Sequence, residues 1–308
     1  MIDVTLLGTS ALMPLPDRAL ASAALSCSGR MILLDCGEGT QTAARKAGVN
    51  LMKTDLIALT HYHGDHIFGL PGLLQTLNCL GRTEPLFITG PRGIREILSP
   101  ILSLAGPLPF PVRTVAIPKA GLPLDSLAPG WPSGSLLQAF PTRHRVPSQG
   151  YRFSLARAGK FRPDRAKELG VPVSSWKDLQ RGLEVTVNGT VFRPEDVLGA
   201  PRRGLSVFFS GDTSVCPGLL EGAKGSDLFI CDATYGEDEQ TQLAKEHGHM
   251  TFSQAGEAAA AAGASRLWLI HYSQMITFPE EYLPNALSRF PGSVCGSDGM
   301  SLTLRFSD

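Results

Sequence analysis

The sequence predicts an α/β protein whose two halves have a similar make-up of strands and helices. Short apolar runs alternate with helical patterns in the first half, and the same alternation resumes at Leu205. The 308 residues include 33 Gly and 23 Pro, which favours many turns and argues against a simple helical bundle. Hydrophobic residues make up 43 % and charged residues 18 %, so the chain as a whole is not intrinsically disordered.

The first half is expected to contain four strands and two helices. We expect strands over 2–7, 31–35, 55–60 and 86–89, and the run at 55–60 is apolar enough for burial on both faces. Leucines at helical spacing predict a helix over 70–80, which ends at Gly81. A second helix is expected to open at Pro91, with apolar residues up to Leu102 on one face.

A loop-rich segment and the second half follow. The segment 106–134 is expected to be mostly loops with a short strand at 112–117, before strands at 136–140 and 151–155. After Leu205 the expected strands are 205–209, 227–231, 266–270 and 301–306. Helices are expected over 252–262, between Thr251 as N-cap and Gly263, and over 280–290.

Residues 156–203 differ from the rest and are predicted to form an inserted basic arm of a single domain spanning 1–308. Between Tyr151 and Arg203 there are eleven Lys or Arg against six Asp or Glu, an excess of +5 in a chain whose 28 cations balance its 28 acids. Overall neutrality excludes a strongly basic nucleic-acid coat. The arm is either a binding element or a solvent-exposed insertion with no partner, and the charge count alone does not decide between the two.

The strongest chemical signal is the segment from Thr60 to His66, THYHGDH, which directly follows the buried strand. His61 and His63 are two positions apart, so an extended turn can aim both at one metal ion, while Asp65 and His66 can serve a second. Imidazole and carboxylate are ligands of Zn²⁺ or Mn²⁺. A chance cluster on a surface loop is the alternative, but three imidazoles and a carboxylate after a buried strand disfavour it.

Further ligands are sought at the ends of other strands. His144, Asp212 and His271 each follow an apolar strand, as His61 does. One carboxylate can bridge two cations with its two oxygens, which makes Asp212 a candidate for a shared ligand. Each of these three residues alone would be read as structural, whereas together they are predicted to be ligands.

The combined pattern resembles the metallo-β-lactamase superfamily and, more narrowly, the ribonuclease Z family of tRNA 3′-processing endonucleases. The narrow resemblance rests on blocks spread over the whole chain: GTS at 8–10, DCGEGTQ at 35–41, HGDHIFGLPGL at 63–73, HRVPSQGY at 144–151, SGDT at 210–213, GHMT at 248–251 and DGM at 298–300. The blocks at 35–41 and 144–151 are the most specific to ribonuclease Z.

The resemblance implies a four-layer αββα sandwich with two Zn²⁺ ions per chain at one edge, Mn²⁺ being an alternative. One zinc would be held by His61, His63, His144 and Asp212, and the other by Asp65, His66, Asp212 and His271. It also implies that the arm grips precursor tRNA and that the enzyme is a homodimer, in which one subunit's arm holds RNA for the other's site. The six cysteines are widely spaced and form no C-x-x-C pair, so we expect small buried thiols in a reducing cytoplasm. The chain shows no apolar run of the ~18 residues that a membrane helix needs.

The implied reaction is attack of an activated water on the phosphodiester, which leaves a 3′-hydroxyl on the tRNA. Asp65 would accept the proton of the water, and His249 would act as the acid for the leaving oxygen, with His247 as a competitor. His249 could instead be a residue of a helix-capping loop. Asp35 is expected to orient a ligand histidine. The cations proposed to contact substrate are Arg18, Arg162, Arg165, Lys167, Lys177 and Arg181.

Three departures from the family pattern keep other functions open. The N-terminal loop keeps Arg18 but lacks the usual Asn, the arm lacks a Gly-Pro motif, and Met275-Ile276 stands where Arg-Tyr is frequent. All three lie in elements that would face substrate. The alternatives are a hydrolase of the same fold that acts on small phosphodiesters or other esters, and an idle metal- or RNA-binding scaffold. The intact set of proposed ligands argues against the scaffold.

Overall fold

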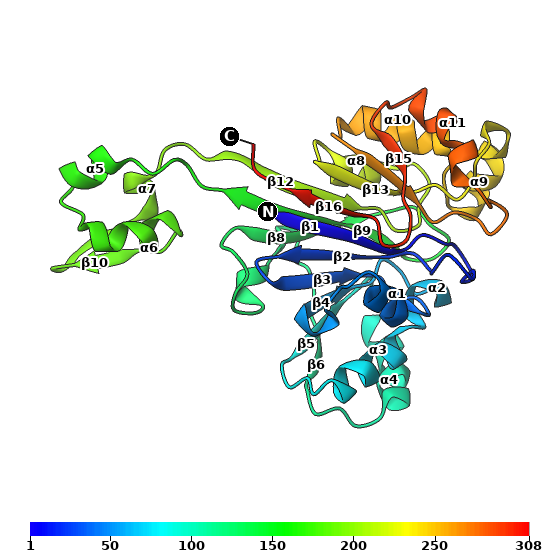
Figure 1. The fold of residues 1–308 in the computed structure, drawn as a ribbon, viewed down its shortest axis with the longest axis horizontal. Coiled ribbons are helices and arrows are strands. Elements are labelled where there is room, and N and C mark those ends of the chain that lie inside the picture. Colours follow the sequence, from blue (N-terminus) through cyan, green and yellow to red (C-terminus); the bar gives the residue numbers. More distant parts are fainter. Residues whose placement is uncertain (308) are drawn as a thin grey trace.

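The computed structural model describes residues 1–307 and shows two seven-stranded sheets packed between two layers of helices (Figure 1). The predicted αββα sandwich is therefore confirmed. Each sheet uses one face to contact the other sheet and one to contact helices, so most of its strands are apolar on both faces. In the described part of the chain, no helix combines the length and apolarity that crossing a membrane requires.

The first sheet has the strand order β16-β1-β2-β3-β4-β5-β6. Neighbours from β16 to β3 pair antiparallel, whereas β3 to β6 pair parallel. Its strands are β1 (Ile2–Gly8), β2 (Ser22–Cys27), β3 (Arg30–Leu34), β4 (Thr54–Ala58), β5 (Leu86–Thr89), β6 (Val112–Thr114) and β16 (Ser301–Leu304). The helices of this half are α1 (Thr40–Lys46), α2 (Gly64–Ile67), α3 (Leu70–Cys79) and α4 (Ile94–Ala105).

The second sheet has the order β15-β14-β13-β12-β9-β8-β7, and its strands β12 to β15 run parallel. Its strands are β7 (Leu122–Pro123), β8 (Ser135–Pro141), β9 (Gln149–Arg157), β12 (Arg202–Phe209), β13 (Leu228–Asp232), β14 (Leu267–Ile270) and β15 (Ser293–Cys295). The helices of this half are α8 (Pro217–Ala223), α9 (Thr241–His247), α10 (Phe252–Ala262) and α11 (Leu283–Leu287).

Three apolar layers hold the sandwich together. The central layer lies between the sheets and includes Leu6 and Leu56 from the first with Phe153 and Phe209 from the second. A second layer packs the leucines of α3 on the first sheet, and a third packs the alanines of α10 on the second. Because both sheets are covered on both faces, polar residues such as His61 and Asp212 are found where the strands end.

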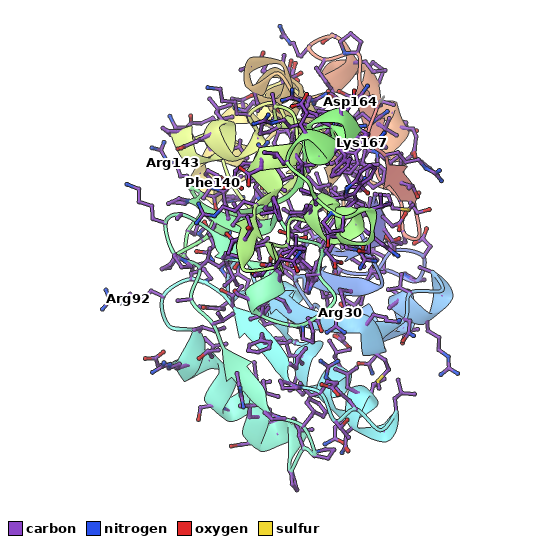
Figure 2. The ribbon with its side chains drawn as sticks, turned by 90° about the vertical axis from the view of Figure 1, so that its left-hand side faces the viewer. Arg30, Arg92, Phe140, Arg143, Asp164 and Lys167 are labelled. Carbon is purple, nitrogen blue, oxygen red and sulfur yellow. The ribbon has the colours of Figure 1, made fainter. Side chains whose placement is uncertain are left out.

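The arm projects from the sandwich where β9 ends and β12 begins, at the end of the molecule opposite α9 (Figure 1). It contains α5 (Pro163–Glu168), α6 (Trp176–Gln180), the hairpin β10 (Val185–Val187) and β11 (Thr190–Phe192), and α7 (Pro194–Val197). Four side chains form a small core of its own: Ala166, Val171, Leu179 and Val197. Figure 2, in which the arm faces the viewer, shows Asp164 and Lys167 on α5.

Several expected elements differ in the structure for identifiable reasons. The prediction missed β2, whose SAALSC sequence is rich in small residues that carry little strand signal. The helix expected from Pro91 begins at Ile94, because Gly93 adopts a left-handed conformation (φ 99°) in front of it. The helix expected over 280–290 is divided into a short 3₁₀ turn and α11, since Pro284 lacks the N–H that would continue one helix.

Candidate metal centre

Loops from both halves meet at one end of the sandwich, where several parallel strands have their carboxyl ends. His61 and His63 follow β4, and α2 carries Asp65 and His66. The residues from the second half are His144 between β8 and β9, Asp212 after β12, and His271 after β14. Figure 1 shows α2, the loop after β1 and α9 together at this end. All seven predicted ligand residues are thus brought into one place.

The first group consists of His61, His63, His144 and Asp212, whose donor atoms all lie within 4.8 Å of one another. His61 Nε2 is 3.0 Å and His144 Nε2 is 3.2 Å from His63 Nδ1. Oδ2 of Asp212 lies 3.6 Å from His61 Nε2. Three nitrogens and a carboxylate oxygen therefore converge on one small volume, as they do around a tetrahedral zinc.

The second group consists of Asp65, His66, Asp212 and His271. Oδ1 of Asp212 lies 3.3 Å from His66 Nε2 and 3.2 Å from His271 Nε2. Oδ2 of Asp65 lies 3.5 Å and 3.6 Å from the same two nitrogens. Because the two oxygens of Asp212 face different groups, its carboxylate has the orientation of a bridging ligand.

The donor chemistry of these residues fits a divalent cation. His66 Nδ1 lies 2.7 Å from Oδ2 of Asp35, so the proton is placed on Nδ1 and the lone pair of Nε2 is left for a metal. His66 Nε2 and His271 Nε2 are buried and have no hydrogen-bond partner among residues 1–307. Two buried imidazole nitrogens without partners are costly unless something coordinates them. The cluster is therefore compatible with a metal site.

Two short hydrogen-bonded chains hold the ligand histidines from behind. The Thr60 hydroxyl donates to Asp35 (2.8 Å), so its oxygen can accept from Nδ1 of His61 at 3.1 Å. In the second half, the Thr234 hydroxyl donates to Asp232 (2.7 Å) and its oxygen lies 3.0 Å from Nδ1 of His271. In both chains the outer imidazole nitrogen is engaged by protein, which directs Nε2 toward the centre.

Three residues of the centre have left-handed backbones that their side chains disfavour: Leu12 (φ 62°), Asp35 (φ 56°) and His271 (φ 62°). Such conformations cost about 1–2 kcal/mol for a residue with a Cβ, and they cluster at functional sites. At Leu12 the strained backbone directs its N–H to Oδ2 of Asp65 at 3.0 Å. The strain is thus used to position polar groups around Asp65.

The electrostatics of the first group favour neutral imidazoles. Burial lowers the pKa of His61, His63 and His144 below the usual histidine range, so all three are neutral at pH 7 and have lone pairs to offer. Burial alone would raise the pKa of Asp65, but the imidazoles of His271 and His66 that face its carboxylate outweigh burial and hold that pKa below its usual range. Asp65 is therefore an anion at neutral pH.

His249 lies beside the centre in the loop before α10. Its Nδ1 is 2.7 Å from Oδ2 of Asp232, and its ring stacks on that of His271 with centroids 5.3 Å apart. Burial opposes the charged imidazolium, but the Asp232 carboxylate outweighs it and raises the pKa of His249 to about 9. His247, the competitor, is exposed and pairs with the hydroxyl of Tyr235.

Sequence reasoning missed Asp232, which accepts from Thr234 and Thr213 and pairs with His249. A signal was present, because Asp232 is the last residue of a buried strand, and the proposed ligand Asp212 also follows a strand. The local sequence does not distinguish Asp212 from Asp232. Asp212 faces the two donor groups whereas Asp232 pairs with His249, and this difference depends on the loops that surround the end of each strand.

The predicted substrate cations fall into two groups. Arg18 is only 9 % exposed, and its Nη2 donates to the carbonyls of Ile276 and Thr277, so it joins the N-terminal loop to the loop after His271. A substrate contact by Arg18 stays a prediction. The other five lie exposed on the arm: Arg162, Arg165, Lys167, Lys177 and Arg181. Arg165 pairs with Glu168 at 3.0 Å.

Comparisons with known proteins place the chain in a family. A family model described as a beta-lactamase superfamily domain matches residues 192–272, and one described as the anti-Pycsar protein Apyc1 matches residues 2–98. Among solved structures, human tRNase Z, short form, has a TM-score of 0.68 at 27 % identity, covering 99 % of this chain and 100 % of its own. The metallo-beta-lactamase fold protein YhfI from Bacillus subtilis has a TM-score of 0.69 at 19 % identity, covering 98 % of both chains, and supports the fold alone.

Curated relatives are similar to this chain over its whole length. Ribonuclease Z of Lachnoclostridium phytofermentans is 40 % identical over 306 residues, covering 99 % of each chain. Ribonuclease Z of Lachnospira eligens is 40 % identical over 308 residues, covering 100 % of this chain and 99 % of the relative. Together with the converging histidines and carboxylates, this full-length identity shows that the chain belongs to the ribonuclease Z family.

Proposed function

We propose that this protein is a zinc-dependent endoribonuclease that removes the 3′ trailer from precursor tRNA and leaves a 3′-hydroxyl on the tRNA. The observation that carries the proposal is the pair of four-donor groups that share Asp212, in a chain 40 % identical over its full length to ribonuclease Z relatives. A pair of metal ions in such groups can activate water for attack on a phosphodiester, and the family supports an RNA substrate.

The metal assignment follows from the donors. One Zn²⁺ would be held by His61, His63, His144 and Asp212, and a second by Asp65, His66, Asp212 and His271. When bound, two such ions lower the pKa of a water molecule toward ~7 and stabilise the charge that develops on the phosphoryl oxygens. The remaining chemistry belongs to side chains that hold or move protons.

Two of these side chains have complementary protonation states. Asp65 is anionic, its Oδ2 accepts from the N–H of Leu12, and it is proposed to accept the proton of the attacking water. His249 has a pKa of about 9 and is therefore protonated at pH 7. It is proposed to donate this proton to the 3′-oxygen of the upstream nucleotide as the bond to phosphorus breaks. Asp232 would stabilise the imidazolium before the transfer.

The arm is proposed to bind the tRNA by its phosphates, in a cytoplasmic homodimer where the arm of one subunit serves the centre of the other. Arg162, Lys167, Lys177 and Arg181 support this proposal, because all four are exposed and none forms an ion pair within residues 1–307. Their charge is therefore available to neutralise a polyanion.

The test offers the purified protein a tRNA with a 3′ extension beside a bare aryl phosphodiester. We expect cleavage next to the discriminator nucleotide, with an apparent KM that rises steeply with salt. Replacing the four arm cations by Gln should lower the slope of log K against log salt by up to about 0.9 per lost phosphate contact. Arg305→Gln, a change at an exposed cation after β16, serves as the matched control. Turnover of the aryl ester alone would instead support a small-phosphodiester hydrolase.

A further inference from the structure

Large apolar side chains stand in solvent at the edge of the metal centre. Leu12 is 66 %, Phe68 is 70 % and Met275 is 81 % exposed, and they come from three separate loops. Each loop is tied to the second donor group. The N–H of Leu12 donates to Asp65, Phe68 directly follows the helix that carries Asp65, and Met275 lies four residues after His271. We call Leu12, Phe68 and Met275 the apolar rim. Exposed apolar patches of this kind mark interaction sites.

At Leu12, neither the backbone nor packing favours a leucine. Its φ of 62° lies in the left-handed region, where Gly or Asn is the residue expected. The polar role of this position belongs to its main-chain N–H, which donates to Asp65, and any residue except proline supplies that group. The exposed leucine side chain therefore has no structural explanation within the folded chain.

Phe68 presents a flat apolar surface beside the metal-binding turn. A Cβ placed on Gly64 would lie 2.3–2.8 Å from atoms of the Phe68 ring, so the ring rests directly against the Gly64 backbone. With 70 % of the residue exposed, the rest of the ring faces solvent. A ring supported on one side and open on the other has the geometry of a stacking platform.

Met275 is held outward by an ordered turn. Its N–H donates to the Ser273 hydroxyl, the N–H of Ile276 donates to the Ser273 carbonyl, and Arg18 donates to the Ile276 carbonyl. Ile276 itself is buried in the apolar layer under α10. Because Ser273 and Ile276 are anchored on either side of it, Met275 stays at the surface, where its flexible thioether can adapt to a flat partner.

We propose that the apolar rim stacks against unpaired nucleobases that flank the scissile phosphodiester. The inference rests on the proposed function, which brings an RNA strand to Asp65 and His271. Bases in single-stranded RNA expose π-faces, and proteins bind them on aromatic and apolar side chains with little sequence preference. A strand whose phosphodiester lies at the centre would carry its neighbouring bases toward the rim, since the three rim residues lie on the loops that are tied to the second donor group.

Binding of a 3′-extended tRNA in EDTA tests the proposal without turnover, with circular dichroism to check the fold. Phe68→Ala, Met275→Gln and Leu12→Asn should each raise Kd by about fivefold or more, which is the effect of about 1 kcal/mol per stacked base. The slope of log Kd against log salt should not change, because no phosphate contact is lost. Leu104→Ala on α4, at a residue that is 77 % exposed, is the matched control and should bind as the unmodified protein does.

An RNA with abasic nucleotides on both sides of the scissile bond sharpens the test. The unmodified protein should bind this RNA more weakly than the intact one, whereas Phe68→Ala should show a smaller difference between the two RNAs, because the variant has already lost the ring's share of the stacking. An equal loss for the unmodified protein and the variant would overturn the proposal.

Two further results separate the possible failures. If the unmodified protein binds no RNA of either kind, the proposed function itself fails. If it binds the intact RNA and all three rim variants bind equally well, only the rim assignment fails. Sedimentation of the proteins without RNA tests whether a second copy of the chain occupies the rim instead. A rim variant that loses self-association but keeps its RNA affinity would identify the rim as a contact between two copies, and would overturn the proposal.

Discussion

The two halves of the molecule supply the candidate metal centre in different ways. The first half provides His61, His63, Asp65 and His66 within six consecutive residues, whereas the second half provides single residues at His144, Asp212 and His271. Behind the ligands, however, the halves are alike: an Asp–Thr pair holds a histidine in each, Asp35 with Thr60 and Asp232 with Thr234. The supporting chemistry is therefore shared, and only the spacing of the ligands along the chain differs.

The largest effect is expected at Asp212, the one proposed ligand that faces both groups. Asp212→Ala should lose bound metal and lower turnover of 3′-extended tRNA by about 10³-fold or more, because it removes several kcal/mol of charge stabilisation. Metal content per chain is measured by plasma mass spectrometry. Asp227→Asn, a change at a carboxylate in front of β13, is the control. Two ions retained by Asp212→Ala would contradict the bridging role.

His249 lies in the second half and differs in role from the proposed ligands, because it is proposed to donate a proton. His249→Ala should keep its metal and lose about 10²-fold or more in turnover. His247→Ala is the natural comparison, since His247 is two residues away and exposed. Normal activity in His249→Ala, or an equal loss in both variants, would remove His249 from the mechanism.

The likeness of the two supporting pairs is tested by changing each carboxylate to an amide. Asp35→Asn should weaken metal affinity by about 10- to 100-fold, because His66 loses the acceptor that orients it. Asp232→Asn should weaken the His271 group in the same way, through Thr234. Competition with a chelator measures both affinities. A large effect of one variant and none of the other would show that the two pairs are not equivalent.

The smallest effect concerns the contact between the halves. Gly211 has a left-handed backbone, and a Cβ added there would lie 2.5 Å from Cβ of Thr60. Gly211→Ala should therefore lower the free energy of unfolding by about 1–3 kcal/mol more than Gly225→Ala. Gly225 is the matched control, because it has a similar φ of +61° with no atom within 4 Å. Equal losses in urea unfolding would mean that the close approach is not needed.

Most of the fold could be predicted because strands and helices in this chain carry strong local patterns. The run at β4 and the alanines of α10 are examples, and α10 has the predicted bounds because Thr251 and Gly263 cap it. β2 could not be predicted, since its small residues become a strand only between β1 and β3. The arm's own core was also missed, because its four buried residues, Ala166, Val171, Leu179 and Val197, are spread over short elements and produce no periodicity.

The amino-acid sequence by itself determined the α/β class with two similar halves, the cluster of three histidines and a carboxylate at 61–66 and the basic excess of the arm, because each depends on residues that are neighbours in the chain. The αββα arrangement was implied by the resemblance to the family. Only the tertiary structure decided which oxygen of Asp212 faces which histidine, that Asp232 charges His249, and that Leu12 stands strained beside Asp65. These relations join residues far apart in sequence, and the packing of the two sheets alone sets their distances.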